Sequence, residues 1–106
     1  MIYELREYVA VPGRADDLHR RFAEMTLDLF REVGLDLAGF WEQVDDRHRI
    51  VYLTRFDTVE QAQDHWARFA ADPRWLAIKA ATEQDGQLIE SISITYLTSP
   101  GYYVSS

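Results

Sequence analysis

The first strand-like stretch of the chain, IYELREY, carries a carboxylate, a guanidinium and a phenol at every second residue. Side chains alternate between the two faces of a strand, so Glu4, Arg6 and Tyr8 share one face while Tyr3 and Leu5 share the other. On such a face Glu4 can act as a general acid or base, and Arg6 can stabilise an enolate or a carboxylate. If Tyr3 and Leu5 face the helices of the fold, the polar row lines the opposite side of the sheet.

A later stretch, RIVYLTRF, supplies further groups for the same face. By the same alternation Tyr52 and Thr54 join the row, and Tyr52 is a second candidate for acid or base chemistry. The candidate catalytic residues are therefore Glu4, Arg6 and Tyr52. The candidate ligand-binding residues are Tyr8, Trp41, Thr54, Phe56 and His65.

The same residues have structural interpretations. Glu4 and Arg6 can form a charged network across a dimer interface, since paired interface charges are common. His65 can serve as a base or a haem ligand, but it also lies one position from a helical apolar stripe, where a partly buried structural histidine is expected. One residue of the pair Phe40 and Trp41 faces the helices and the other a cavity or partner, depending on whether Gly39 forms a bulge.

Motifs for other chemistries are missing from the sequence. It contains no cysteine, and its three histidines are too dispersed for a local metal motif, so we expect no metal. No glycine-rich phosphate loop and no GxSxG nucleophile elbow occurs. We expect no cofactor.

The elements that position these residues follow from periodicity and turn signals. After the first strand, apolar residues from Ala15 to Val33 recur with helical spacing up to Gly34. LAGFWEQV and RIVYLTRF predict a hairpin joined by the polar DDRHR. TVEQAQDHWARFAADP predicts a helix capped by Thr58, and Pro73 begins a short further helix. LIESISITYL predicts the last strand.

The order β-α-β-β-α-β predicts an α+β, ferredoxin-like subunit with a four-stranded antiparallel sheet. Its helices cover one face of the sheet. The other face carries more apolar surface than is expected in solvent, so we expect a homodimer. We expect one domain over residues 1–98 and a C-terminal tail over residues 99–106, in which Tyr102 and Tyr103 are either flexible or cap the partner's barrel.

Composition narrows the function classes. The chain has 106 residues, is 47% hydrophobic and has a formal net charge of -7, which indicates one globular domain. Its basic residues are interleaved with acids, which disfavours nucleic acid as a partner. No apolar run approaches the roughly 18 residues of a membrane span, and no secretory profile begins the chain. We therefore expect no membrane partner and a cytoplasmic location.

Four motifs in order, IYELREYVAVPG, VGLDLAGFW, FDTVEQA and AADPRWLAI, resemble those of the NIPSNAP family. The resemblance implies a dimeric α/β barrel, in which the sheets of two subunits pack together with helices outside and a cavity between the sheet and surrounding elements. Family members often carry His and Trp on the third strand, where this chain has Tyr52 and Thr54. A role of that histidine cannot be transferred here.

Related barrel families include cofactor-free monooxygenases, polyketide cyclases, haem-degrading enzymes and binding proteins. We expect the chain to bind a small apolar or aromatic molecule, polyketide-like in character, with cofactor-independent acid/base chemistry as its enzymatic form. The alternatives are a non-catalytic protein that dimerises through its sheet, and haem binding or degradation. An enclosed space of roughly 300 Å³ or more, lined by Glu4, Arg6 and Tyr52, would favour the first hypothesis, and a filled barrel would favour the non-catalytic protein.

Overall fold

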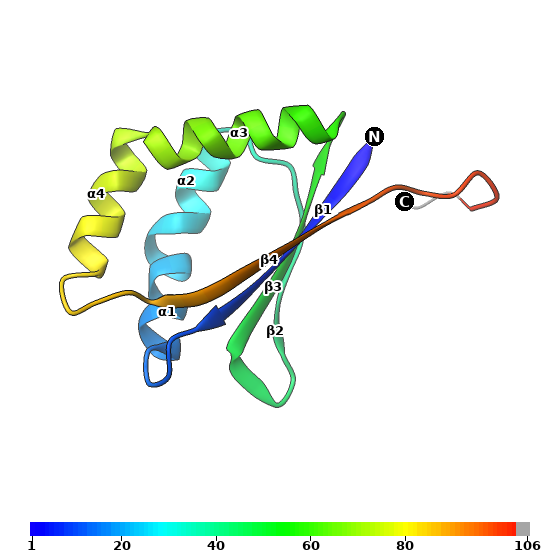
Figure 1. Ribbon diagram of the computed structural model, residues 1–106. Coiled ribbons are helices and arrows are strands. Elements are labelled where there is room, and N and C mark those ends of the chain that lie inside the picture. Colours follow the sequence, from blue (N-terminus) through cyan, green and yellow to red (C-terminus); the bar gives the residue numbers. More distant parts are fainter. Residues whose placement is uncertain (104–106) are drawn as a thin grey trace.

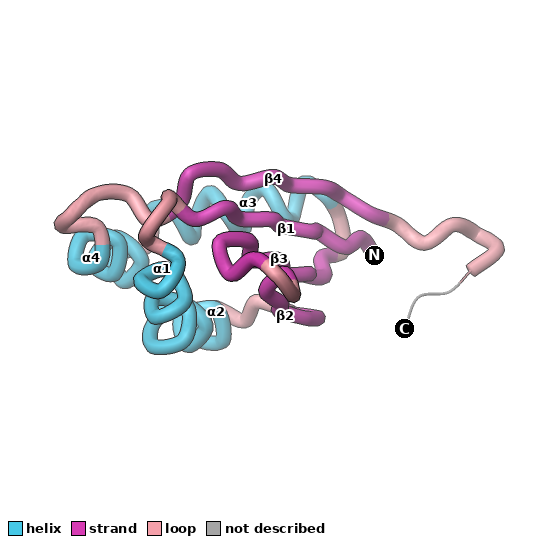
Figure 2. The backbone as a smooth tube through the Cα atoms, turned by 90° about the horizontal axis from the view of Figure 1, so that it is seen from below, coloured by secondary structure: helices cyan, strands magenta, loops and turns pink. Residues whose placement is uncertain are grey.

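The computed structural model describes residues 1–103 and has a layer of helices on one face of an antiparallel sheet (Figure 1). The four strands lie in the order β2-β3-β1-β4. They are β1 (Ile2–Ala10), β2 (Leu37–Gln43), β3 (Asp46–Phe56) and β4 (Ile89–Leu97). The predicted ferredoxin-like α+β fold is confirmed. Figure 2 shows the strands side by side in this order, with α1, α2 and α4 beside them and α3 behind them.

The first helical region is continuous but not uniform. It consists of α1 (Ala15–Arg21), the π-helical segment η1 (Phe22–Thr26) and α2 (Leu27–Glu32). A π-helix takes more residues per turn than an α-helix, so it rotates the buried stripe. Thr26 is buried, whereas Met25, which a 3.6-residue period places on the apolar stripe, is only partly buried. Arg21 is also buried.

The second helical region matches the sequence closely. Helix α3 (Val59–Ala71) begins at Thr58, whose hydroxyl accepts a hydrogen bond from the Gln61 amide. Helix α4 (Pro73–Thr82) begins at Asp72, whose carboxylate accepts from the Arg74 amide. A side-chain acceptor satisfies an N–H at each helix start, and Pro73 needs no such partner.

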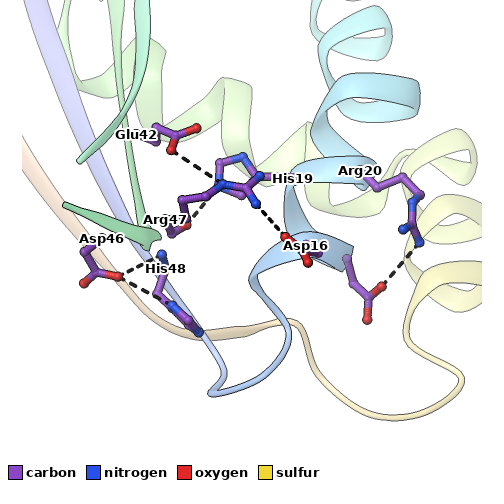
Figure 3. A network of polar contacts seen from close by, with 8 residues as sticks. Asp16, His19, Arg20, Glu42, Asp46, Arg47 and His48 are labelled. Carbon is purple, nitrogen blue, oxygen red and sulfur yellow. Dashed lines mark hydrogen bonds and ion pairs between the residues drawn. The ribbon is translucent and has the colours of Figure 1, made fainter. Parts of the chain in front are cut away.

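The β2–β3 hairpin is tighter than predicted. DDRHR was expected as a polar connection, but β3 already begins at Asp46. Arg47 joins the hairpin to α1, donating from Nη1 to Asp16 at 2.6 Å, while its backbone carbonyl lies 2.8 Å from His19 Nε2 (Figure 3). His48 lies 3.5 Å from Asp46 in the same network. These contacts fix the hairpin end rather than a buried site.

A bulge is present at Gly39, and it decides the orientation of its neighbours. The register of β2 against β3 shifts between Leu37 and Gly39. Phe40 then stacks on Tyr52 on the helix side, whereas Trp41 lies on the uncovered face and is 52% exposed. The Trp41 indole covers Gly39 so closely that a Cβ there would clash with it.

The C-terminal segment leaves the sheet after β4 and extends away from the helices (Figure 1). Tyr102 and Tyr103 are exposed within it. The predicted tail runs to residue 106, and its residues 104–106 lie outside the described residues. Among residues 1–103, no helix is both long and apolar enough to cross a bilayer.

Candidate functional site

The polar row of β1 faces the helices, not the uncovered side of the sheet. Glu4, Arg6 and Tyr8 are buried, whereas Tyr3 and Leu5 are only partly covered. Tyr3 and Leu5 therefore do not face the helices, and the polar row does not line the opposite side of the sheet. The polar row can be buried because it has partners on the helix side: the Trp66 indole donates to Glu4, and the Tyr52 hydroxyl pairs with Tyr8.

A pocket of about 520 Å³ that is open to solvent on one side lies between the sheet and the helices, and we refer to it as the cavity. Arg6 and Tyr8 contribute to its sheet side, and Phe22, Phe30 and Trp66 contribute aromatic rings from the helices. The volume falls within the range of small-molecule sites. The walls combine aromatic and aliphatic side chains with charged ones, among them Lys79, Glu83 and Glu90. The lining also includes Thr26, whose buried hydroxyl has no hydrogen-bond partner.

Glu4 and Arg6 form a buried pair next to this cavity. Arg6 Nη1 lies 3.3 Å from Glu4 Oε1, and the Trp66 indole N–H donates to the same oxygen at 2.7 Å. The Arg6 guanidinium lies over the Trp66 ring, 4.1 Å from its centroid. Glu4 is fully buried and does not line the cavity. In this arrangement Glu4 contacts both Arg6 and Trp66, and Arg6 is the member of the charged pair that lines the cavity.

Tyr8 and Tyr52 form a second buried pair. Their hydroxyl oxygens lie 2.6 Å apart, which brings the aromatic and acid/base candidates of β1 and β3 together. Burial, followed by the neighbouring Tyr8, raises the pKa of Tyr52 well above its usual range. Tyr52 therefore remains a protonated phenol, which can donate a hydrogen bond but cannot act as a base near neutral pH.

The helix side of the cavity contains charged residues that the sequence did not single out. Arg21 is 3% exposed, donates to Glu83 at 2.8 Å, and lies over the Trp75 ring, 5.0 Å from its centroid. Trp66 and Trp75 also line the cavity. A possible signal for Arg21 was its position beside Leu18 and Phe22, on the edge of the apolar stripe.

Several predicted ligand-binding residues do not line this cavity. Trp41 lies on the other face of the sheet. Thr54 is fully buried, and its hydroxyl donates to the Glu4 carbonyl at 3.3 Å. Phe56 packs against the His65 ring.

His65 belongs to a separate, smaller hollow of about 220 Å³, which it shares with Arg68 and Asp72. Its ring packs against Trp66 and Phe69, and its buried Nε2 has no hydrogen-bond partner. Burial, and then the charge of Arg68, lowers the pKa of His65. Because His65 does not line the larger cavity, it cannot supply a haem ligand there. Within residues 1–103, no cluster of three or more His, Asp or Glu side chains could hold a metal ion.

Comparisons with known proteins agree on the family and the fold. The NIPSNAP family model matches residues 3–100. A NIPSNAP domain protein from Burkholderia xenovorans is similar in structure, with a TM-score of 0.78, 20% identity, and coverage of 99% of this chain and 100% of that one. A protein from Agrobacterium tumefaciens has a TM-score of 0.76 and 23% identity, with 96% of each chain covered.

A more distant structure carries a functional name. A Nitrosomonas europaea protein named as a candidate antibiotic biosynthesis monooxygenase has a TM-score of 0.63 and 15% identity, covering 93% of this chain and 98% of that one. At this identity the likeness shows the shared fold alone. No curated protein matches the chain.

Proposed function

This chain belongs to the NIPSNAP family, and we propose that it binds a small apolar or aromatic molecule in the cavity between sheet and helices. The observation that carries this proposal is the combination of volume and lining: about 520 Å³, bordered by aromatic rings and by the buried Arg6. A cavity of this size accommodates a molecule of two or three fused rings. The polyketide-like ligands expected from the sequence are of this kind.

The enzymatic form of the proposal is acid/base chemistry without a cofactor, such as cyclisation, isomerisation or oxygenation. Arg6 and Tyr8 are the polar groups of the β1 row that border the cavity, so they are the residues that would contact a ligand. Glu4 and Tyr52 lie behind them and act by positioning. The named monooxygenase with the same fold is consistent with this chemistry but does not establish it.

A dimeric barrel is a further part of the proposal. The face of the sheet opposite the helices carries Leu5, Val51 and Leu53 on its central strands and the exposed Trp41 on β2. No element of the described chain covers this face (Figure 1). Burying it against the same face of a second copy would remove the apolar surface from water.

The binding proposal is tested by the fluorescence of Trp66 and Trp75, which border the cavity. Trp41 is first replaced, in Trp41→Phe, so that the signal comes from those two residues. Titration with 7-methoxycoumarin, a neutral two-ring probe, is expected to quench this emission with saturation. In Ala70→Trp, which adds an indole to the cavity lining, binding should weaken at least about tenfold because the space is occupied.

Ala67→Trp is the matched control, since Ala67 and Ala70 are both exposed alanines of α3 but only Ala70 lines the cavity. Binding to these two variants is measured from the emission of the coumarin rather than from tryptophan quenching, because each variant adds a tryptophan. Equal binding by both variants would place the probe elsewhere and contradict the proposal. No binding by any form would favour a non-catalytic protein that dimerises through its sheet.

A further inference from the structure

One hydrogen bond joins the hydroxyls of Tyr8 and Tyr52, so only one of their two hydroxyl protons takes part in it. Tyr52 is fully buried, and the Tyr8 oxygen is the hydrogen-bond partner that the structure gives its hydroxyl. A buried donor without an acceptor is destabilising, so Tyr52 donates and Tyr8 accepts. The proton of Tyr8 is then free for another acceptor, and Tyr8 borders the cavity.

Donation from Tyr52 also strengthens Tyr8 as a donor. Hydroxyl groups linked in a chain polarise one another, most effectively where water is excluded. The Tyr52 phenol stays protonated because it is buried, so this donation persists across the neutral pH range. The pair therefore presents one polarised O–H to the cavity.

Arg6 places a positive charge near the Tyr8 ring. Its guanidinium carbon lies 5.9 Å from the centroid of the Tyr8 ring, and both residues line the cavity. Glu4 contacts only Nη1, at 3.3 Å, and the buried Arg6 Nε has no partner. The hydrogen-bonding capacity of the guanidinium is thus only partly used within the chain. A donor and a cation that converge from one strand are the components of a site for a negatively charged oxygen.

Resting on the proposed ligand-binding function, we propose that the cavity holds its ligand as an oxyanion, the phenolate or enolate oxygen accepting a hydrogen bond from Tyr8 beside Arg6. The ligand class is therefore aromatic phenols and enolisable aromatic ketones. The acidic proton of the ligand passes to solvent, and no bond other than the ligand's O–H or C–H bond is broken. The aromatic rings around the site, among them Phe22, Phe30 and Trp66, hold the carbon skeleton.

The test compares two probes that differ in one group. 7-Hydroxycoumarin ionises, and its neutral and anionic forms absorb at different wavelengths; 7-methoxycoumarin has the same rings and cannot ionise. At a saturating concentration of protein, the pH is varied and the absorption spectrum of the bound 7-hydroxycoumarin is recorded. The pKa of the bound phenol is expected to fall by about one unit or more, equivalent to at least about tenfold tighter binding of the anion.

Variants assign this shift to the proposed donors. Tyr8→Phe should abolish most of the shift, and Tyr52→Phe should reduce it partly because Tyr8 loses its supporting donor. Tyr8→Phe leaves the Tyr52 hydroxyl buried without a partner, so the double variant Tyr8→Phe/Tyr52→Phe, which removes both hydroxyls, guards against misfolding. Tyr3→Phe, on the opposite face of β1, is the matched control and should leave the shift unchanged.

The outcomes separate the two proposals. If 7-methoxycoumarin binds and the bound phenol titrates as in water, ligand binding stands and the oxyanion site is wrong. A shift that survives in the double variant would also overturn the role of the tyrosines. If neither probe binds, both proposals are contradicted.

Discussion

Glu4 illustrates how one buried carboxylate organises a site from a distance. Its Oε1 atom accepts from Trp66 Nε1 and lies within ion-pair distance of Arg6, so it joins β1 to α3. A buried charge is tolerated only when it is paired and hydrogen-bonded. Removing the charge of Glu4 therefore removes the compensation for Arg6, whose side chain is 9% exposed.

We expect Glu4→Gln to lower the free energy of unfolding by about 3 to 5 kcal/mol, because it leaves a buried guanidinium without its counter-charge. Urea denaturation monitored by circular dichroism measures the change. Glu7→Gln on the same strand is the matched control, since Glu7 points to the uncovered face and should change stability by less than about 1 kcal/mol. A similar decrease in the free energy of unfolding in both variants would show that the buried Glu4–Arg6 pair contributes no more to stability than a surface charge does.

His65 predicts a dependence of stability on pH. Burial and Arg68 lower its pKa in the folded chain, while the unfolded chain binds a proton near about pH 6.5. The unfolded state therefore takes up the proton first as pH falls. The contribution of neutral His65 is complete above pH 6.5 and is lost as pH falls towards the folded-state pKa.

The measurement is the free energy of unfolding of wild type and His65→Phe between about pH 7.5 and 5. Wild type should lose more stability over this interval, since phenylalanine keeps the aromatic packing against Phe56 and Phe69 but cannot take up a proton. Arg6 also opposes protonation of His65, and Glu4 and Asp64 favour it. Parallel pH profiles in the two proteins would contradict the prediction.

At the level of elements, the sequence predicts the positions of the strands and helices well, but it predicts less well which side of each is buried. Period and capping residues locate α3 and α4, and the bulge at Gly39 is readable from a glycine within a strand pattern. The π-helical segment is not readable, because the residues Phe22–Thr26 also fit an α-helix. Its rotation of the stripe brings Thr26 into the cavity lining, where a strict 3.6-residue period predicts Met25.

The strand pattern alone also does not predict which face of β1 is buried. Alternation groups Glu4, Arg6 and Tyr8 correctly, but it does not say which group is buried, and charged residues are usually solvated. Burial here depends on Trp66 and Tyr52, which lie 62 and 44 residues away along the chain. Such long-range partners are supplied by the fold.

Helix α4 contributes Trp75 and Lys79 to the cavity lining, and its start depends on Asp72. The Asp72 carboxylate accepts from the Arg74 amide at 2.8 Å and from Arg74 Nη2 at 2.7 Å. We expect Asp72→Ala to speed amide hydrogen exchange severalfold within Pro73–Thr82, because the first turn loses its cap. Exchange detected by mass spectrometry would resolve this helix from the sheet.

Asp72→Asn separates the cap from the ion pair, since the amide oxygen still accepts from the backbone but carries no charge. It should exchange nearly as slowly as wild type. Exchange as fast in Asp72→Asn as in Asp72→Ala would assign the effect to the charge, and an acceleration spread over all strands would mean global destabilisation instead.

For the whole molecule, the two faces of the sheet differ in what covers them. The helix face contains the cavity, so the uncovered face is available for association. By strand register Leu53 lies beside Leu5 and Gly39 near the middle of this face. In the proposed dimer the cavities lie outside the subunit interface, and ligand binding and association are separable by mutation.

We therefore expect wild type to sediment at twice the chain mass at micromolar concentration, and Leu53→Glu to sediment as a monomer, because two copies would bury like charges at the interface. Leu76→Glu, at a 50% exposed leucine on α4, is the matched control and should remain a dimer. Sedimentation velocity measures all three proteins. A monomeric wild type would contradict the dimer, and a dimeric Leu53→Glu would place the interface elsewhere. If monomeric Leu53→Glu still binds 7-methoxycoumarin, each subunit forms its cavity without the partner, as the lining drawn from a single chain predicts.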